Sequence, residues 1–424
     1  MMEAYITAGA IFIVTFYAIL SGKFDRSIAS FAGAMAMVVA GIALGFYSQE
    51  AAFGMIDFNV MGLLLGMMVI VSVCKKTGFF SYVAIKTVKA SGGSPLRLMI
   101  MLGCITAFLS MALDNVTTII LIIPITILVC DILGINPLPM IVSEIVLSNI
   151  GGVGTMIGDP PNMMIASSAG FSFNDFIVHL FPIVLVAMAL SFVVLIIVFK
   201  KDICKRPKDF RPILDIDERQ AIKDVKSLRK VIFALSIVFA LFIAQKKFGL
   251  HHSFIALLGA GVVLVLVRPK IEEVIKDVEW PVLIFFASLF VLIGGLEHSG
   301  ILNIIAKQVV RLASLNYTLA KVSLLWISGI SSALVGAIPF TTSMLPVIKY
   351  VGVLGQETGS LWWVLALGVG FGGCGTPIGT MAGVVGLSMS ERTRTPIDFK
   401  TWLKTATIVM LVNLIFVTLL IKII

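Results

Sequence analysis

Acidic side chains stand inside two long apolar segments of this 424-residue chain. Asp114 is followed by Asn115 in one segment, and Asp159 lies between Gly158 and Pro160 in the other. On insertion scales, an ionisable residue near the centre of a bilayer costs about 2.5–3.5 kcal/mol. Two acids kept at such positions predict exchange of a proton or a cation across a membrane. For Asp114 the alternative is a buried helix cap, because Asp and Asn favour that position.

The glycine-rich run 151–158, ahead of Asp159, predicts a broken helix. Glycine weakens a helix interior, and the residue before a proline is pushed towards extended backbone. We therefore expect the helix to stop near Gly151 and to restart at Pro160, with free N–H groups facing the gap. No Gly-Lys-Ser/Thr follows the run, which argues against a phosphate-binding P-loop. Glu144, shortly before the break, is either a third proton carrier or a carboxylate hydrogen-bonded inside the helix bundle.

Related motifs recur in the second half of the chain without their acids, at Gly336-Ala337 and around Thr380. The site is therefore predicted to be asymmetric, with acids from one half only. The predicted proton- or cation-coupling residues are Asp114, Asp159 and Glu144. Amides, hydroxyls, glycines and one proline are expected to form the substrate pocket: Asn115, Thr117, Thr118, Ser148, Asn149, Gly151, Gly152, Thr155, Asn162, Pro339, Thr341, Thr342, Gly373, Gly375 and Thr376.

Basic residues are missing from the segments that carry these motifs. No Lys or Arg occurs in 111–134, 147–170, 331–348 or 368–390. A strongly anionic solute would have to rely on helix N-termini alone, whereas a neutral or cationic solute meets no such difficulty. The pattern thus disfavours dicarboxylates and tricarboxylates as substrates.

The composition requires a membrane protein, since 59% of the residues are hydrophobic and only 13% are charged. A span needs roughly 20 apolar residues. Two further apolar stretches, about 115–133 and 337–355, contain prolines, and each is predicted to be a re-entrant hairpin that lines a cavity. The expected spans are about 4–21, 28–47, 58–74, 97–113, 138–168 (broken), 176–199, 230–248, 252–268, 281–297, 319–334, 361–388 (broken) and 401–421.

The chain also repeats itself. The stretch from Asp57 to Pro124 resembles the stretch from Glu279 to Pro346, and 151–158 resembles 372–379. We predict an all-α polytopic membrane protein made of two inverted repeats of about six spans each, with two re-entrant hairpins and two broken helices. The expected parts are an N-terminal repeat 1–199 (scaffold about 1–96, transport part about 97–199), a linker 200–229 and a C-terminal repeat 230–424 (transport part about 319–400). The linker is rich in Lys and Arg and is therefore predicted to be cytoplasmic.

At Leu113–Pro124 and Asn149–Asn162 the chain resembles the ion transporter superfamily, especially the arsenite efflux pumps, the P protein and the D-type sodium/proton antiporters. The resemblance implies a homodimer with elevator-type movement. Arsenite and antimonite are neutral trihydroxides at pH 7 and suit a pocket of amides and hydroxyls, so we expect their proton-coupled efflux. A sodium/proton antiporter is the alternative, although Gly336-Ala337 replaces the Asp-Asn expected in the second hairpin. A dicarboxylate transporter is less favoured. A soluble ATPase docking on the linker would be consistent with some arsenite pumps.

Other classes of protein are disfavoured. The chain has no HExxH zinc motif and no GxSxG nucleophile elbow, so we expect neither an enzyme nor a bound metal or cofactor. The five cysteines show no CxxC spacing and no disulfide is expected. Eleven of the 32 Lys and Arg residues lie between Lys200 and Lys230, where they indicate membrane topology, so the net charge of +9 does not imply nucleic acid as a partner. The expected surroundings are the lipids of a bacterial or archaeal cytoplasmic membrane (the inner membrane where there are two).

Overall fold

The computed structural model describes residues 2–21, 23–204, 217–391, 393 and 395–424, and every regular element in these ranges is a helix. The elements are α1 (Met2–Leu20), α2 (Arg26–Leu44), α3 (Gln49–Gly54), α4 (Phe58–Lys76), α5 (Phe79–Ala90), α6 (Pro95–Ala112), α7 (Asn115–Leu133), α8 (Leu138–Gly152), α9 (Pro160–Ala169), α10 (Phe173–His179), α11 (Phe181–Val198), α12 (Lys200–Ile203), the 3-10 helix η1 (Glu218–Ala221), α14 (Val225–Ile243), α15 (Gln245–Phe248), α16 (His252–Val267), α17 (Ile271–Asp277), α18 (Trp280–Ser299), α19 (Ile301–Leu315), α20 (Tyr317–Val335), α21 (Ala337–Val353), α22 (Gly359–Gly372), α23 (Met381–Ser390), α24 (Phe399–Leu403) and α25 (Ala406–Leu420).

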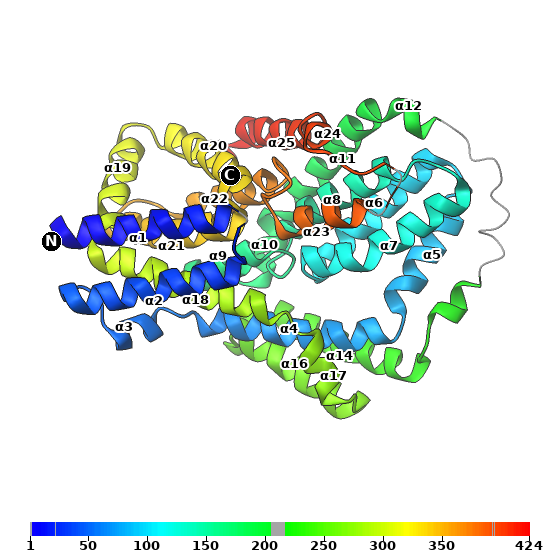
Figure 1. Cartoon of the computed structure of the whole chain (residues 1–424), viewed down its shortest axis with the longest axis horizontal. Coiled ribbons are helices and arrows are strands. Elements are labelled where there is room, and N and C mark those ends of the chain that lie inside the picture. The colour runs from blue at the N-terminus through cyan, green and yellow to red at the C-terminus, as the bar shows by residue number, and fades with distance from the viewer. Residues whose placement is uncertain (1, 22, 205–216, 392, 394) are drawn as a thin grey trace.

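Two helical hairpins enter the molecule from opposite ends and meet near its middle (Figure 1). The first is made of α6 and α7, with Leu113 and Asp114 at its tip, and the second of α20 and α21, with Gly336 at its tip. Glycine suits the second tip because its backbone has φ +102°, a value that other residues rarely adopt. The hairpins thus bring two tight turns together in the interior.

The prediction that 115–133 and 337–355 each fold back as a hairpin is wrong in this detail. Both stretches are single helices, α7 and α21, which continue through Pro124 and Pro346. Each hairpin instead takes its other arm from the preceding segment. A proline inside a helix removes one hydrogen bond, and neighbouring helices or local adjustments can compensate for it within a membrane.

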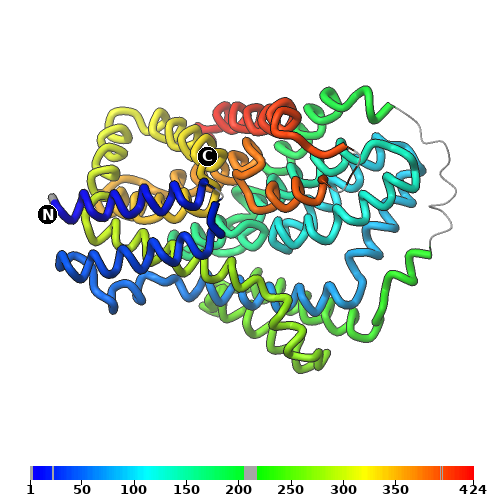
Figure 2. The backbone as a smooth tube through the Cα atoms, viewed as in Figure 1, coloured from blue at the N-terminus to red at the C-terminus, as the bar shows by residue number. Residues whose placement is uncertain are grey.

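The two halves repeat the same order of elements in opposite orientation. The short helix α5 lies at one end of the molecule and its counterpart α19 at the other (Figures 1 and 2). Helices of one half pack against helices of the other: α4 packs along α16, and α2 packs along α18. Within each half the hairpin packs on a broken helix, α6 on α8 and α20 on α22. The prediction of an all-helical membrane protein with inverted repeats is confirmed.

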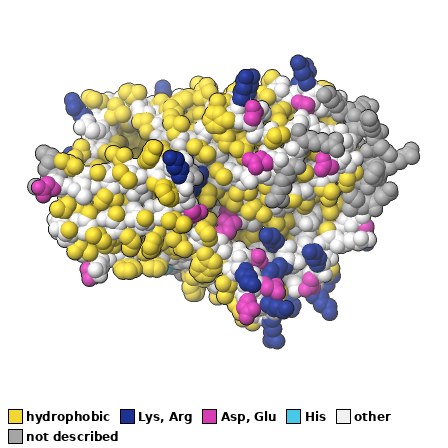
Figure 3. All heavy atoms as spheres, viewed as in Figure 1, with side chains coloured by type: hydrophobic (Ala, Val, Ile, Leu, Met, Phe, Trp, Pro, Cys, Tyr) yellow, Lys and Arg dark blue, Asp and Glu magenta, His cyan; other side chains and the backbone are white. Residues whose placement is uncertain are grey.

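Apolar side chains cover most of the face drawn in Figure 3, while Lys, Arg, Asp and Glu gather towards the end that holds α5, α12 and α17. We call this the linker end. Nine helices of the described residues are long and apolar enough to cross a membrane. Within the predicted linker 200–229, residues 205–216 lie outside the described ranges. The division into scaffold and transport parts, and the cytoplasmic position of the linker end, remain predictions.

Candidate functional site

Asp114 stands at the tip of the first hairpin and caps α7. Its Oδ1 accepts a hydrogen bond of 2.8 Å from the backbone N–H of Thr117, and its Oδ2 accepts one of 2.5 Å from the Thr117 hydroxyl. Thr118 donates its hydroxyl to the Asp114 carbonyl oxygen. Asp114 also lines a central cavity. The carboxylate is thus a helix cap that also lines the cavity, and its exchange of a proton or a cation remains a prediction.

Asn115 connects the hairpin tip to Asp159. Its side-chain amide donates to Asp159 Oδ1 at 3.3 Å and accepts from the Ser110 hydroxyl. The Ser148 hydroxyl donates to the Asn115 carbonyl oxygen at 3.3 Å. Asp159 is 5% exposed. A chain of neutral polar groups thus fixes the orientation of a buried carboxyl group.

The break between α8 and α9 forms as predicted. Asp159 is extended (φ −143°, ψ 131°) and α9 begins at Pro160. Polar side chains hold the loop in shape: the Thr155 hydroxyl donates to the Met111 carbonyl at 2.5 Å, and the Asn162 amide donates to the carbonyls of Val153 at 3.0 Å and Thr155 at 2.8 Å. Thr155 therefore binds the backbone of α6 and Asn162 binds the backbone of the loop, and neither is among the residues that line the cavity.

Gly151 and Gly152 allow the broken helix to approach the first hairpin closely. A Cβ atom on Gly151 would lie 2.5 Å from the Ala107 carbonyl oxygen, and one on Gly152 would overlap Asn115 Oδ1. Both approaches are far closer than an ordinary van der Waals contact. Gly151 therefore allows α8 to pack closely against α6, and Gly152 leaves space for the Asn115 side chain.

The second half builds the opposite wall from backbone and hydroxyl groups. Ala337 N–H donates to the Gly379 carbonyl at 3.2 Å, which connects the second tip to the second break. The Thr380 hydroxyl accepts from the Asn149 amide at 3.1 Å and thereby joins the two halves. Five further predicted residues do not line the central cavity: Thr341, Thr342, Gly373, Gly375 and Thr376. The three threonine hydroxyls donate to backbone carbonyls.

Glu144 lies apart from this constellation. It is fully buried in α8, and its Oε1 accepts a hydrogen bond of 2.5 Å from the Thr126 hydroxyl. Its Oε2 has no hydrogen-bond partner among the described residues. The structure thus places Glu144 in the helix bundle, outside the lining of the central cavity.

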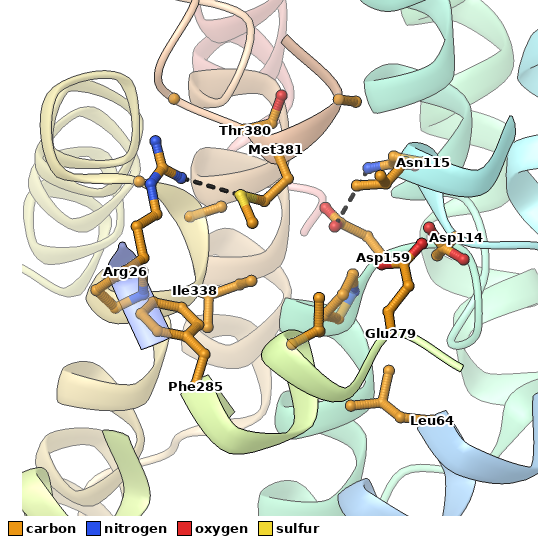
Figure 4. Close-up of a pocket in the computed structure, with 18 of the residues that line it drawn as sticks. Arg26, Leu64, Asp114, Asn115, Asp159, Glu279, Phe285, Ile338, Thr380 and Met381 are labelled. Carbon is orange, nitrogen blue, oxygen red and sulfur yellow. Dashed lines mark hydrogen bonds between the residues drawn. The ribbon is translucent and has the colours of Figure 1, made fainter. Parts of the chain in front are cut away.

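The cavity where the two tips and the two breaks meet has a volume of about 70 Å³, enough for several water molecules. Of the predicted site residues, four line it: Asp114, Asn115, Asp159 and Pro339. Two charged residues that the sequence analysis missed also line it, Glu279 at the start of α18 and Arg26 at the start of α2. Figure 4 shows the three acids on one side of the cavity and Arg26 on the other.

Arg26 corrects the argument drawn from the missing basic residues. Its guanidinium reaches the Met381 sulfur at 3.1 Å, so a distant helix brings a positive charge to the site. The sequence could have indicated Glu279 as a candidate site residue, because the internal repeat pairs it with Asp57. No comparable sequence feature indicated Arg26. Among the described residues, no group of three or more His, Cys, Asp or Glu side chains is arranged to hold a metal ion.

Comparisons with known proteins agree with this architecture. The chain is 40% identical over 400 residues to a 46 kDa membrane protein of Mycobacterium leprae, covering 93% of this chain and 92% of the relative. It is 40% identical over 418 residues to an uncharacterized transporter of Mycobacterium tuberculosis, with 97% and 96% covered. It is also 28% identical over 473 residues to the human P protein, covering 92% of this chain and 56% of that protein. The predicted resemblance to the P protein is thereby confirmed.

The fold has a counterpart among solved structures. The YdaH transporter of Alcanivorax borkumensis, described as having an unusual topology, superposes with a TM-score of 0.59 at 18% identity, over 91% of this chain and 88% of that one. The family model described as citrate transporter, CitMHS, matches residues 16–368. The chain is therefore a membrane transporter that belongs to the CitMHS family.

Proposed function

We propose that this transporter is a proton-coupled secondary carrier that binds its solute in the central cavity. The observation that carries the proposal is the meeting of two hairpin tips and two helix breaks at one cavity, with the carboxyl groups of Asp114 and Asp159 in its wall. Acidic side chains inside a membrane typically mark the path of a proton or a cation, so we expect this cavity to exchange them. Asp159 is the principal proton carrier, and Asn115 holds it in place.

For the solute we propose arsenite or antimonite, which is exported in its uncharged trihydroxide form. Three acidic side chains and one arginine line the cavity, a balance that disfavours a free polyanion, whereas a neutral solute pays no such electrostatic cost. The volume of about 70 Å³ also suits a solute of a few heavy atoms. Amide and carbonyl groups of the tips then bind the hydroxyl groups of the solute.

A carboxylate solute is the second candidate, and Arg26 favours it. Guanidinium groups recognise carboxylates well, and the family model is described as citrate transporter. Protonation of the cavity acids would remove the repulsion and would itself couple carboxylate movement to protons. A sodium/proton exchange on the same acids is a further outcome that the experiment below separates.

The transport movement that we propose is of the elevator type. The hairpins and broken helices would move together along a frame formed by α2, α4, α16 and α18, which pack across the two halves. A homodimer and a soluble ATPase bound at the linker end are proposals that rest on the resemblance alone.

The test is a solute panel in everted membrane vesicles that contain the full chain. Arsenite, antimonite, sodium, lithium, citrate and succinate are offered in turn, with and without a proton gradient. Arsenite uptake that collapses with the gradient supports the first proposal, and Asp159→Asn is expected to reduce it at least tenfold. Glu50→Gln, an exposed acid on α3, is the matched control and should leave uptake unchanged. Uptake of citrate without arsenite would select the second candidate, and undiminished uptake by Asp159→Asn would refute the role of that residue.

A further inference from the structure

Glu279 comes from a different part of the fold than the other two acids of the central cavity. Asp114 and Asp159 come from α7 and the break before α9, whereas Glu279 precedes α18, a helix that packs on α2 and belongs to the proposed frame. In Figure 4 its side chain lies beside those of Asp114 and Asp159. Glu279 therefore faces the site from a different body of the protein.

A second cavity, of about 50 Å³, begins at this residue. Its lining includes Met68, Ser72, Lys75, Thr117, Asp277 and Glu279, and it lies towards the linker end, where α4 meets α17. Glu279 and Met68 line both cavities. Thr117, whose hydroxyl donates to Asp114, also stands in the wall of the second cavity. Glu279 thus stands where the two cavities adjoin, and Asp114, which lines the central one, is joined to the wall of the second through Thr117.

Besides Glu279, two further charged residues line the second cavity, Asp277 and Lys75. Asp277 accepts a hydrogen bond of 2.9 Å from the Ser72 hydroxyl and lies 3.5 Å from Lys76 Nζ. Lys75 lies in the same wall. These polar groups favour water, through which protons can reach Glu279 from the linker end.

The repeat offers a comparison within one molecule. Asp57, the counterpart of Glu279, caps α4 by accepting from the backbone N–H groups of Asn59 at 2.9 Å and Val60 at 3.1 Å. The Glu279 side chain makes no such capping bond to the described residues of α18. Asp is a preferred N-cap and Glu is not, and Pro281 at the second position of α18 has no N–H to donate. The carboxyl group of Glu279 therefore remains available to the cavity.

We propose that Glu279 is the proton port of the linker end, which passes protons between the second cavity and the Asp114–Asp159 pair. The inference rests on the proposed proton coupling and not on the identity of the solute. A proton from water in the second cavity binds the Glu279 carboxylate, and Glu279 then gives it to the carboxylate of Asp114 or Asp159 and becomes ionised again. The reverse sequence releases a proton. When the hairpins move along the frame, the acids of the site leave Glu279 and this route closes.

Electrical recording of proton binding tests the port without any solute. Everted vesicles holding the full chain are adsorbed on a solid-supported membrane, and the pH on the linker side is stepped. Wild type should give a transient current, and Glu279→Gln should slow it at least tenfold. Glu279→Asp, which keeps a carboxyl group, should recover most of the rate. Glu273→Gln is the matched control, because Glu273 is an exposed acid on α17 that lines neither cavity.

Each outcome decides the matter. A wild-type rate in Glu279→Gln overturns the port, and equal slowing by Gln and Asp replaces it with a requirement for side-chain size. A normal current with no transport of any panel solute refutes the proposed solutes and leaves the port standing. The absence of a wild-type current overturns proton coupling and the port together. Size-exclusion profiles of the purified variants identify any that fail to fold.

Discussion

Replacing Gly151 by Ala places a methyl group where the backbone of α6 already lies. The new Cβ would stand 2.5 Å from the Ala107 carbonyl oxygen and 2.8 Å from its Cα. Both contacts are backbone atoms, so a side-chain rotation cannot relieve them. Overpacking of this kind costs about 1–3 kcal/mol, and we expect the upper end. Alanine recovers about 1 kcal/mol of helix propensity, which leaves a net loss of about 2 kcal/mol.

Gly261→Ala is the matched control, because Gly261 lies in α16 and a methyl group added there would have no heavy atom within 4 Å. It should gain up to about 1 kcal/mol. Scaled to 424 residues, the usual unfolding entropy corresponds to roughly 0.9 kcal/mol per kelvin. Thermal melting of the purified protein in detergent should therefore fall by about 2 K for Gly151→Ala and rise by up to about 1 K for Gly261→Ala. A Gly151→Ala protein that melts at or above the wild-type temperature would refute the close-packing argument.

Three further predictions concern polar contacts. Trp402→Phe removes the 2.9 Å bond from the indole N–H to the Cys374 carbonyl and should lower the free energy of unfolding by about 1–3 kcal/mol, measured as a lower melting temperature. Thr126→Val leaves the buried Glu144 without its donor and should cost a similar amount, whereas Thr126→Ser should cost less. Burial raises the pKa of Asp175, but hydrogen bonds from Lys246 and Ser172 outweigh this effect and hold the pKa below its ordinary value. The resulting stabilisation is present at neutral pH and is lost as the pH falls through the folded-state pKa. Asp175→Asn should therefore flatten the acid side of a plot of melting temperature against pH.

Local chemistry made part of this structure predictable. The glycines of 151–158 and the proline after Asp159 act on their own backbone, so the break and the restart at Pro160 follow from residue type alone. The same reasoning gave too much weight to Pro124. A single lost hydrogen bond did not end α7, and the turn formed at Asp114, where a capping residue was available. The sequence analysis had named Asp114 as a possible helix cap, so the signal for that turn was present.

Long-range placement was harder to predict. Arg26 and Glu279 reach the cavity only because helices from the two halves pack across each other, and periodicity carries no information on that packing. The internal repeat pairs Glu279 with Asp57, but it does not indicate that Glu279 lines the central cavity. Thr155, Thr376 and Asn162 had side chains suited to a solute, yet they bind nearby backbone, since a buried carbonyl group needs a donor. Which partner a hydroxyl group finds depends on the assembled fold.

The crossed pairing of α4 with α16 and of α2 with α18 has a consequence for how the protein is made. α4 ends at Lys76, but the helix that packs along it begins at His252, and α2 receives its partner only when α18 has been synthesised. Domains made early usually fold before the ribosome has finished. Here α1 and α2 can pack on each other at once, but α2 still lacks α18 and α4 still lacks α16, and lipid must cover those surfaces until the second half emerges. A ribosome that stops after the first half would therefore release a product in which α2 and α4 are without these partners.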